Sequence, residues 1–157
     1  MTDSFDDLRD LYQEVILDHG RRPRHARRLE SFDATAEGDN PICGDRIEVW
    51  VKYAPDGTIA DTGFQARGCA ISVASADLMA ETVIGRSRSD THALFEAFRE
   101  MARTGTCKHC DAALAEPLER LEPLAGVREY PSRVKCATLA WHALAAALEG
   151  GKEASSE

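Results

Sequence analysis

Five cysteines carry most of the chemistry that this sequence could perform. They stand at Cys43, Cys69, Cys107, Cys110 and Cys136. In a reducing compartment an odd set of this kind indicates metal binding or catalysis rather than disulfides. The motif NPICGD at residues 40–45 adds a carboxylate, Asp45, two residues after the first thiol. These side chains are therefore the first candidates for a functional site.

The expected backbone around each candidate favours a shared site. Cys43 and Asp45 stand at the entrance of an expected strand, where residues i and i+2 point to the same side. Cys69 is expected where a strand gives way to a helix, and Cys136 just before the last helix. A thiol at a helix N-terminus meets unpaired N–H groups, which lower its pKa and favour the thiolate.

Three thiolates and one carboxylate would form a tetrahedral ligand set that suits zinc, and the soft sulfur donors argue against magnesium or calcium. The three cysteines at 43, 69 and 136 are 26 and 67 residues apart, unlike the local pairs of a zinc finger. Three buried structural cysteines remain an alternative, because free cysteine is among the most buried residue types. The neighbouring Gly, Pro and helix starts favour the metal site.

The size of the chain indicates one globular unit that could position these ligands. With 157 residues, of which 43% are hydrophobic, it can bury a core of its own. We predict one domain over residues 1–150 and a disordered tail over residues 151–157.

Alternating apolar residues predict a small sheet. The pattern covers residues 32–36 and 47–53, a turn is expected in APDG at residues 54–57, and a third, weaker strand over residues 58–66. These segments predict a three-stranded antiparallel meander.

Helical spacing of apolar residues predicts several helices around this sheet. They are expected over residues 4–20, 70–84, from Ser89 or Asp90 to about 101, and from about Cys136 to Leu148. The fold class is therefore α+β, with a small antiparallel sheet packed against several helices.

The net charge of the chain argues against a nucleic-acid partner. Lys and Arg total 19 and Asp and Glu total 27, for a net charge of −8, which opposes a nucleic-acid backbone. The acidic N-terminus does not resemble a signal peptide and no long apolar run occurs, so we expect a cytoplasmic protein with no membrane partner. The segment RRPRHARR at residues 21–28 is basic. It is either a solvated loop or a docking patch for an acidic partner.

Four segments together resemble the SufU family of zinc-dependent sulfur-transfer proteins, a branch of the IscU/NifU-like iron-sulfur assembly superfamily. They are NPICGD, GFQARGCAISVASADLM at residues 63–79, YPSRVKCATLAWHAL at residues 130–144 and DLYQEVILDHGRRPRH at residues 10–25. The similarity covers the chain from the first helix to the last and implies the IscU/SufE-like fold.

The resemblance also implies a site and a reaction. Zinc would be held by Cys43, Asp45, Cys69 and Cys136, and Cys43 would be the catalytic thiol that accepts persulfide sulfur. The sulfur donor would be a SufS-type pyridoxal-phosphate cysteine desulfurase, which would supply a ligand that displaces Cys43 from the metal. A downstream Suf cluster-assembly scaffold would receive the sulfur. Arg133 could stabilise thiolate or persulfide charge, or it could be an ordinary surface charge.

Two further functions remain open. The first is an IscU-type scaffold on which an iron-sulfur cluster is assembled. Such scaffolds carry His before the third cysteine, whereas this chain has Lys135, which is no neutral imidazole ligand at neutral pH. The long stretch between Cys69 and Cys136 also resembles SufU. The second is a structural zinc module, which predicts that Cys43→Ala abolishes folding.

The pair Cys107 and Cys110, in CKHC, departs from the family pattern. Two thiols do not close a zinc site, even with His109. An accessory redox-sensitive pair, an incidental loop feature and a second metal site shared across a dimer all remain open. The other histidines, at positions 19, 25, 92 and 142, are expected to be surface or core residues rather than ligands.

Overall fold

The computed structural model describes residues 4–41, 44–107, 112–151 and 153–155, and the side chains of residues 13–41, 44–107 and 112–151. Cys43 and Cys110 lie outside these residues. The remaining candidate residues can be placed in the fold.

Three strands form the predicted antiparallel meander. They are β1 Ala34–Asn40, β2 Asp45–Tyr53 and β3 Ile59–Arg67. The β1–β2 register pairs Asn40 with Asp45, and the β2–β3 register pairs Arg46 with Arg67. The predicted α+β class with a three-stranded antiparallel sheet is confirmed.

A fourth strand extends the sheet. Strand β4 Glu153–Ser155 pairs in parallel with β1 and makes the strand order β3-β2-β1-β4. The prediction of a disordered tail is therefore wrong for these three residues. The edge of β1 presents backbone N–H and C=O groups with which a further strand can pair. This pairing joins segments that are far apart in the sequence, so the composition of the tail does not predict it.

The described residues also form five α-helices and two 3₁₀ segments. Their bounds are α1 Ser4–Arg21, α2 Ala70–Val83, α3 Arg88–Thr104, η1 Ala112–Leu114, α4 Ala115–Leu121, η2 Glu122–Glu129 and α5 Pro131–Leu148. Helix α3 is capped by Ser87, not by Ser89 or Asp90. Helix α5 begins at Pro131, five residues before the predicted start, because proline is well suited to the first helical position.

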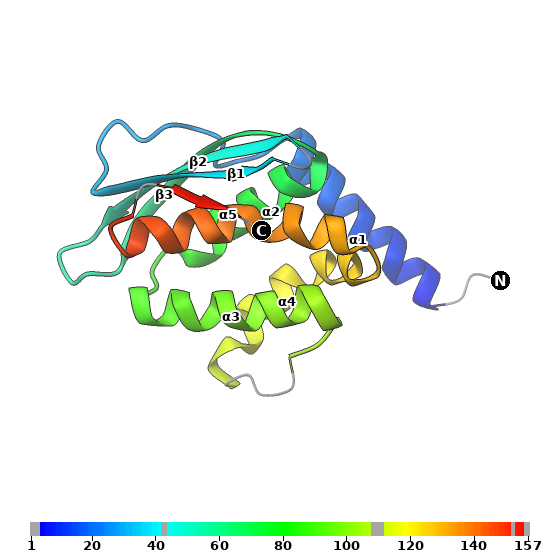
Figure 1. Cartoon of the computed structure of the whole chain (residues 1–157). Coiled ribbons are helices and arrows are strands. Elements are labelled where there is room, and N and C mark those ends of the chain that lie inside the picture. Colours follow the sequence, from blue (N-terminus) through cyan, green and yellow to red (C-terminus); the bar gives the residue numbers. More distant parts are fainter. Residues whose placement is uncertain (1–3, 42–43, 108–111, 152, 156–157) are drawn as a thin grey trace.

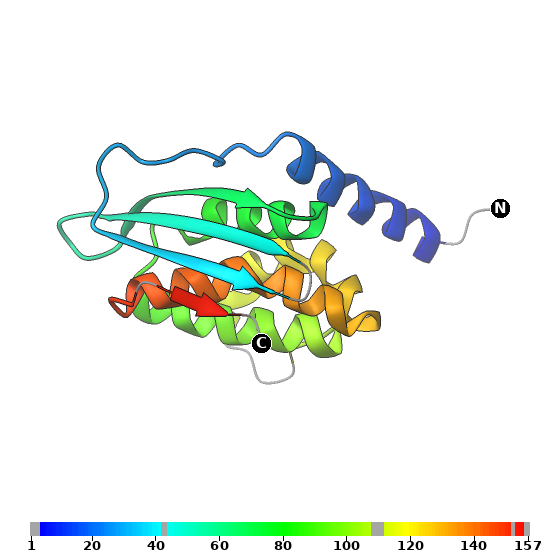
Figure 2. The same cartoon turned by 45° about the horizontal axis from the view of Figure 1, so that its top comes forward.

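The elements form layers (Figures 1 and 2). Helices α2 and α5 pack side by side against one face of the sheet, and α3 packs against α5 on the side away from it. Helix α1 lies along α2. A single apolar core joins the inner face of the sheet to these helices, with Val49, Phe64, Met79, Phe98 and Trp141 among its fully buried members. None of the described helices is both long and apolar enough to cross a membrane.

The basic segment after α1 is attached to the body of the protein. The segment runs alongside β3 (Figure 2), where the His25 carbonyl oxygen accepts a hydrogen bond from the Phe64 N–H at 3.1 Å and a Cβ on Gly63 would clash with the carbonyl oxygen of Arg27. Three of its arginines have partners within the chain, namely Arg24 with Asp18, Arg27 with Asp61, and Arg28 over the ring of Trp50. These contacts do not decide between the two predicted functions of the segment, a solvated loop and a docking patch for an acidic partner.

A buried carboxylate fastens the same segment to α2. Asp77 Oδ1 accepts hydrogen bonds from the backbone N–H groups of Arg24 and His25, both at 2.8 Å. Its Oδ2 lies 2.5 Å from His19 Nδ1. His19 is thus a structural partner of Asp77, a link that its isolated place in the sequence does not reveal.

Candidate metal centre

Three of the four predicted ligands meet at one end of the sheet. One ligand atom each from Asp45, Cys69 and Cys136 lies within 4.8 Å of the other two. Asp45 is the first residue of β2, Cys69 directly precedes α2, and Cys136 lies in the second turn of α5. The fold therefore brings together residues that are far apart in sequence.

The fourth predicted ligand, Cys43, lies outside the described residues, so its place at this site stays a prediction. The neighbouring Gly44 has a φ of 74°, in the left-handed region that favours glycine, and its N–H donates to the Asn40 carbonyl oxygen at 2.8 Å. In the sequence, Cys43 precedes Asp45, the first residue of β2, by two positions. Among the described residues, Cys107 does not belong to the ligand group.

The carboxylate of Asp45 is enclosed, with a residue exposure of 3%. The backbone N–H of Cys69 lies 3.3 Å from Oδ1, and the Ser72 hydroxyl donates to Oδ2 at 2.8 Å. A Cβ on Gly68 would lie 2.5 Å from Oδ1, so the carboxylate occupies the space that any side chain at position 68 would need. Glycine at this position is therefore a requirement of the site.

Cys69 has the environment predicted for it. It is the N-cap of α2, and its sulfur accepts a hydrogen bond from the Ser72 N–H at 3.5 Å. The same sulfur lies 4.0 Å from Asp45 Oδ2. A half-buried thiol at a helix N-terminus can serve as a thiolate ligand.

Cys136 differs from the prediction. Because α5 already begins at Pro131, Cys136 lies inside the helix and does not meet the free N–H groups of its first turn. Its thiol donates to the Ser132 carbonyl oxygen at 3.5 Å. Burial, together with the nearby Asp45 and Cys69, raises the pKa of this thiol well above its ordinary value. The expected lowering of this pKa is wrong.

Arg133 lies one turn before Cys136 and close to both thiols. The negative charge of a Cys69 thiolate, and then the contact with Cys136, raise the pKa of the Arg133 guanidinium. This position is compatible with the predicted electrostatic function of Arg133, which remains a prediction.

Two site residues were not recognised from the sequence. No pattern in the sequence analysis marks Ser72, yet its hydroxyl donates to Asp45 Oδ2 at 2.8 Å. Asn40 is fully buried and is the register partner of Asp45, and its side-chain amide has no hydrogen-bond partner within the described part of the chain. Its position as the first residue of the NPICGD motif is the sequence feature that could have identified Asn40 as a site residue.

The donor chemistry of the site fits zinc. Two thiol sulfurs and one carboxylate match the ligand types of tetrahedral zinc, which needs one further ligand. The carboxylate already has a definite orientation, because the Cys69 N–H faces Oδ1 while the Ser72 hydroxyl and the Cys69 thiol face Oδ2. Cys43, two residues away along the chain, is the candidate for the remaining ligand.

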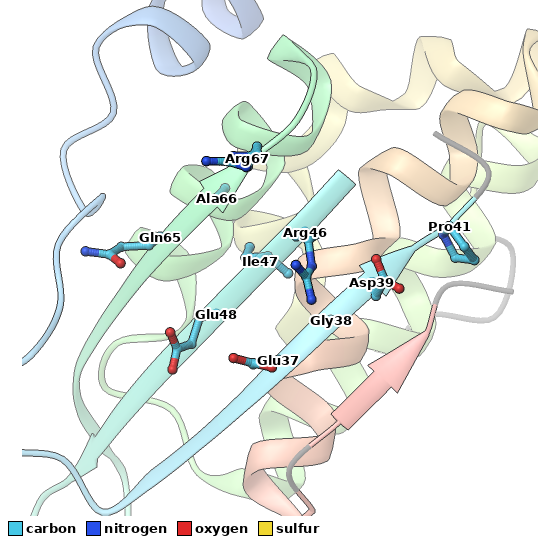
Figure 3. Close-up of a pocket in the computed structure, with 10 residues that line it drawn as sticks. All are labelled: Glu37, Gly38, Asp39, Pro41, Arg46, Ile47, Glu48, Gln65, Ala66 and Arg67. Carbon is cyan, nitrogen blue, oxygen red and sulfur yellow. The ribbon is translucent and has the colours of Figure 1, made fainter. Parts of the chain in front are cut away.

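An open hollow of about 910 Å³ lies on the outer face of the same end of the sheet. Figure 3 shows charged and polar side chains from three strands along it, including Glu37, Arg46, Glu48 and Arg67. Side chains alternate between the two faces of a strand, so Arg46 points outward while Asp45 is buried on the inner side. The hollow and the ligand group thus occupy opposite faces.

Two known proteins are similar to this chain over most of its length. A relative from Streptococcus pyogenes serotype M1, named iron-sulfur cluster assembly scaffold protein IscU, is 41% identical over 90% of this chain and 85% of its own. The zinc-dependent sulfurtransferase SufU of Bacillus subtilis is 36% identical over 90% of this chain and 93% of its own.

A solved structure shares the fold. It comes from Fervidobacterium islandicum AW-1 and is described as an iron-sulfur cluster assembly scaffold protein for the SUF system. It has a TM-score of 0.74 and 30% identity, over 86% of this chain and 94% of its own. The profile of the NifU-like N-terminal domain matches residues 11–137. The chain therefore belongs to the family of NifU-like N-terminal domains, which confirms the predicted resemblance to the IscU/NifU superfamily.

Proposed function

We propose that this protein is a zinc-dependent sulfurtransferase in iron-sulfur cluster assembly. It would accept sulfur on Cys43 from a SufS-type cysteine desulfurase and pass it to a downstream Suf scaffold. The observation that carries the proposal is the convergence of Asp45, Cys69 and Cys136 within 4.8 Å. The name of the Bacillus subtilis relative supports both the metal and the reaction.

Cys43, Asp45, Cys69 and Cys136 would hold the metal. Bound zinc supplies a positive charge that keeps coordinated thiols deprotonated at neutral pH. Cys136 would need this charge to become a thiolate at neutral pH, because burial raises the pKa of its thiol. Asp45 is the hard oxygen ligand in a group otherwise made of sulfur.

The transfer is a thiol exchange in which Cys43 is the nucleophile. Its thiolate attacks the outer sulfur of a persulfide on the desulfurase and forms a new S–S bond. The bond between that outer sulfur and the desulfurase cysteine breaks, and its electron pair leaves as the desulfurase thiolate. No external oxidant or reductant is needed. Arg133 would stabilise the negative charge that accumulates around the reacting sulfurs.

An IscU-type scaffold is the second candidate, supported by the name of the 41% identical relative. A scaffold would hold an iron-sulfur cluster as cargo on the same cysteines. Lys135 argues against this reading, because a protonated amine has no lone pair with which to bind iron. Lys135 is half-buried and directly precedes Cys136.

Zinc content and desulfurase stimulation test the proposal together. We expect one zinc per wild-type chain and faster turnover of a SufS-type desulfurase, with stimulation lost in a folded Cys43→Ala variant. Cys107→Ala, outside the ligand group, is the control and should stimulate normally. Full stimulation by Cys43→Ala would reject Cys43 as the acceptor, whereas failure of that variant to fold would favour a purely structural zinc.

A further inference from the structure

Ser72 contacts all three described ligand residues. It is the third residue of α2, with an exposure of 5%. Its hydroxyl oxygen lies 2.8 Å from Asp45 Oδ2, 3.3 Å from the Cys136 carbonyl oxygen and 3.7 Å from Cys69 Sγ. No other described hydroxyl has a recorded hydrogen bond to Asp45.

The single proton of this hydroxyl has two possible acceptors, the Asp45 carboxylate and the Cys136 carbonyl. The carboxylate is closer, and hydrogen bonds to ionised acceptors are the stronger ones. The Cys69 N–H faces the other carboxylate oxygen at 3.3 Å. Together these two donors define both the plane and the direction of the carboxylate.

We propose that Ser72 is a positioning residue of the metal centre, whose hydroxyl holds Asp45 in the orientation that binds zinc. The inference rests on the proposed zinc function and adds a residue to it. Ser72 acts through Asp45 and is not itself a ligand. Because the hydroxyl is buried, water cannot readily replace it when it is removed.

Groups that orient metal ligands contribute to the affinity for the metal, and their removal typically weakens metal binding by about 10–100-fold. We expect Ser72→Ala to weaken zinc binding by about this factor, measured by competition with a chromophoric chelator in the full chain. The visible spectrum of the cobalt-substituted protein should change as well, because the geometry of the oxygen ligand changes. Ser72→Thr, which keeps the hydroxyl, should restore both.

Ser75→Ala is the matched control. Ser75 lies one turn further along α2, is fully buried, and donates to the carbonyl oxygen of Ala137 in α5. It thus links the same two helices without touching Asp45. Its loss should lower stability while leaving zinc affinity and the cobalt spectrum close to those of the wild type.

The outcomes are distinguishable. Wild-type zinc affinity and spectrum in Ser72→Ala would overturn the inference but not the proposed function. A wild-type protein that binds no zinc would overturn the zinc function itself, and the inference with it. If Ser72→Ala does not fold, Ser72→Thr and Ser72→Val replace it as a pair of equal shape. Tighter binding by the threonine variant supports the inference, and equal binding overturns it.

Discussion

Asp45 and Asp77 are two buried carboxylates with different surroundings. Their exposures are 3% and 0%. Asp77 meets nitrogen donors on both oxygens, from two backbone N–H groups at 2.8 Å and from His19 at 2.5 Å. Asp45 meets one backbone N–H at the longer distance of 3.3 Å, one hydroxyl, and two thiols.

The comparison of Asp45 with Asp77 shows that burial alone does not identify a functional carboxylate. Both oxygens of Asp77 already meet nitrogen donors, and the candidate metal group among the described residues does not include it, so it fastens the basic segment to α2. Asp45 shares its surroundings with two cysteine sulfurs, a type of donor that zinc binds. The partners of a buried acid, rather than its exposure, therefore separate a structural contact from a candidate metal ligand.

The largest expected effect is at Asp77. Asp77→Ala would leave three donors without an acceptor, and each buried donor that loses its acceptor costs about 1–3 kcal/mol. Urea unfolding of the metal-free protein measures this loss. Asp77→Asn should recover part of it, because the amide oxygen can still accept from Arg24 and His25. If Asp77→Ala lowers the free energy of unfolding no more than the removal of an exposed ion pair does, Asp77 does not fasten the basic segment to α2.

The stability of the metal-free protein should depend on pH through Cys136, which lies beside Asp45 and not beside Asp77. The folded pKa of Cys136 is raised above its ordinary value of 9.0, so the associated stability is complete below about pH 9 and is lost as the pH rises further. The free energy of unfolding of the metal-free protein should fall by up to about 1.4 kcal/mol per pH unit there. Unfolding series at several pH values measure the slope. Cys136→Ala should flatten it and Asp77→Ala should not; an unchanged slope in Cys136→Ala would reject this cause.

Asp45→Ala should destabilise the metal-free protein much less than Asp77→Ala. Ser72 can turn its proton to the Cys136 carbonyl, 3.3 Å away, and the bond from Cys69 is already long. We expect a loss of about 1 kcal/mol, the usual net value of a hydrogen bond. The same urea experiment applies. Losses of equal size at Asp45 and Asp77 would remove the distinction between the two sites.

The smallest effect is expected for Arg24→Ala. Asp77 contacts the backbone N–H of Arg24, whereas the Arg24 side chain pairs with Asp18 at the surface. Exposed ion pairs contribute little to stability. The urea midpoint should therefore remain nearly unchanged, and a loss comparable to that of Asp77→Ala would show that the side chain, not the backbone, holds this segment.

Local patterns were sufficient for much of the fold. Alternation over β2 and helical spacing over α2 depend on neighbouring residues, so these elements were predicted close to their actual bounds. The N-cap position of Cys69 followed from the same local change of period. The start of α5 was missed because Pro131 was not recognised as its first residue.

By itself the sequence determined the class of the fold, the candidate ligand residues and the family motifs, because these depend on residue identity and local spacing. Only the tertiary structure decided that Ser72 donates a hydrogen bond to Asp45, that Cys136 is a buried thiol with a raised pKa, and that Asp77 accepts hydrogen bonds from the basic segment. Each of these properties is set by contacts between residues far apart in the chain. Burial and hydrogen bonding at such contacts arise only when separate elements pack together.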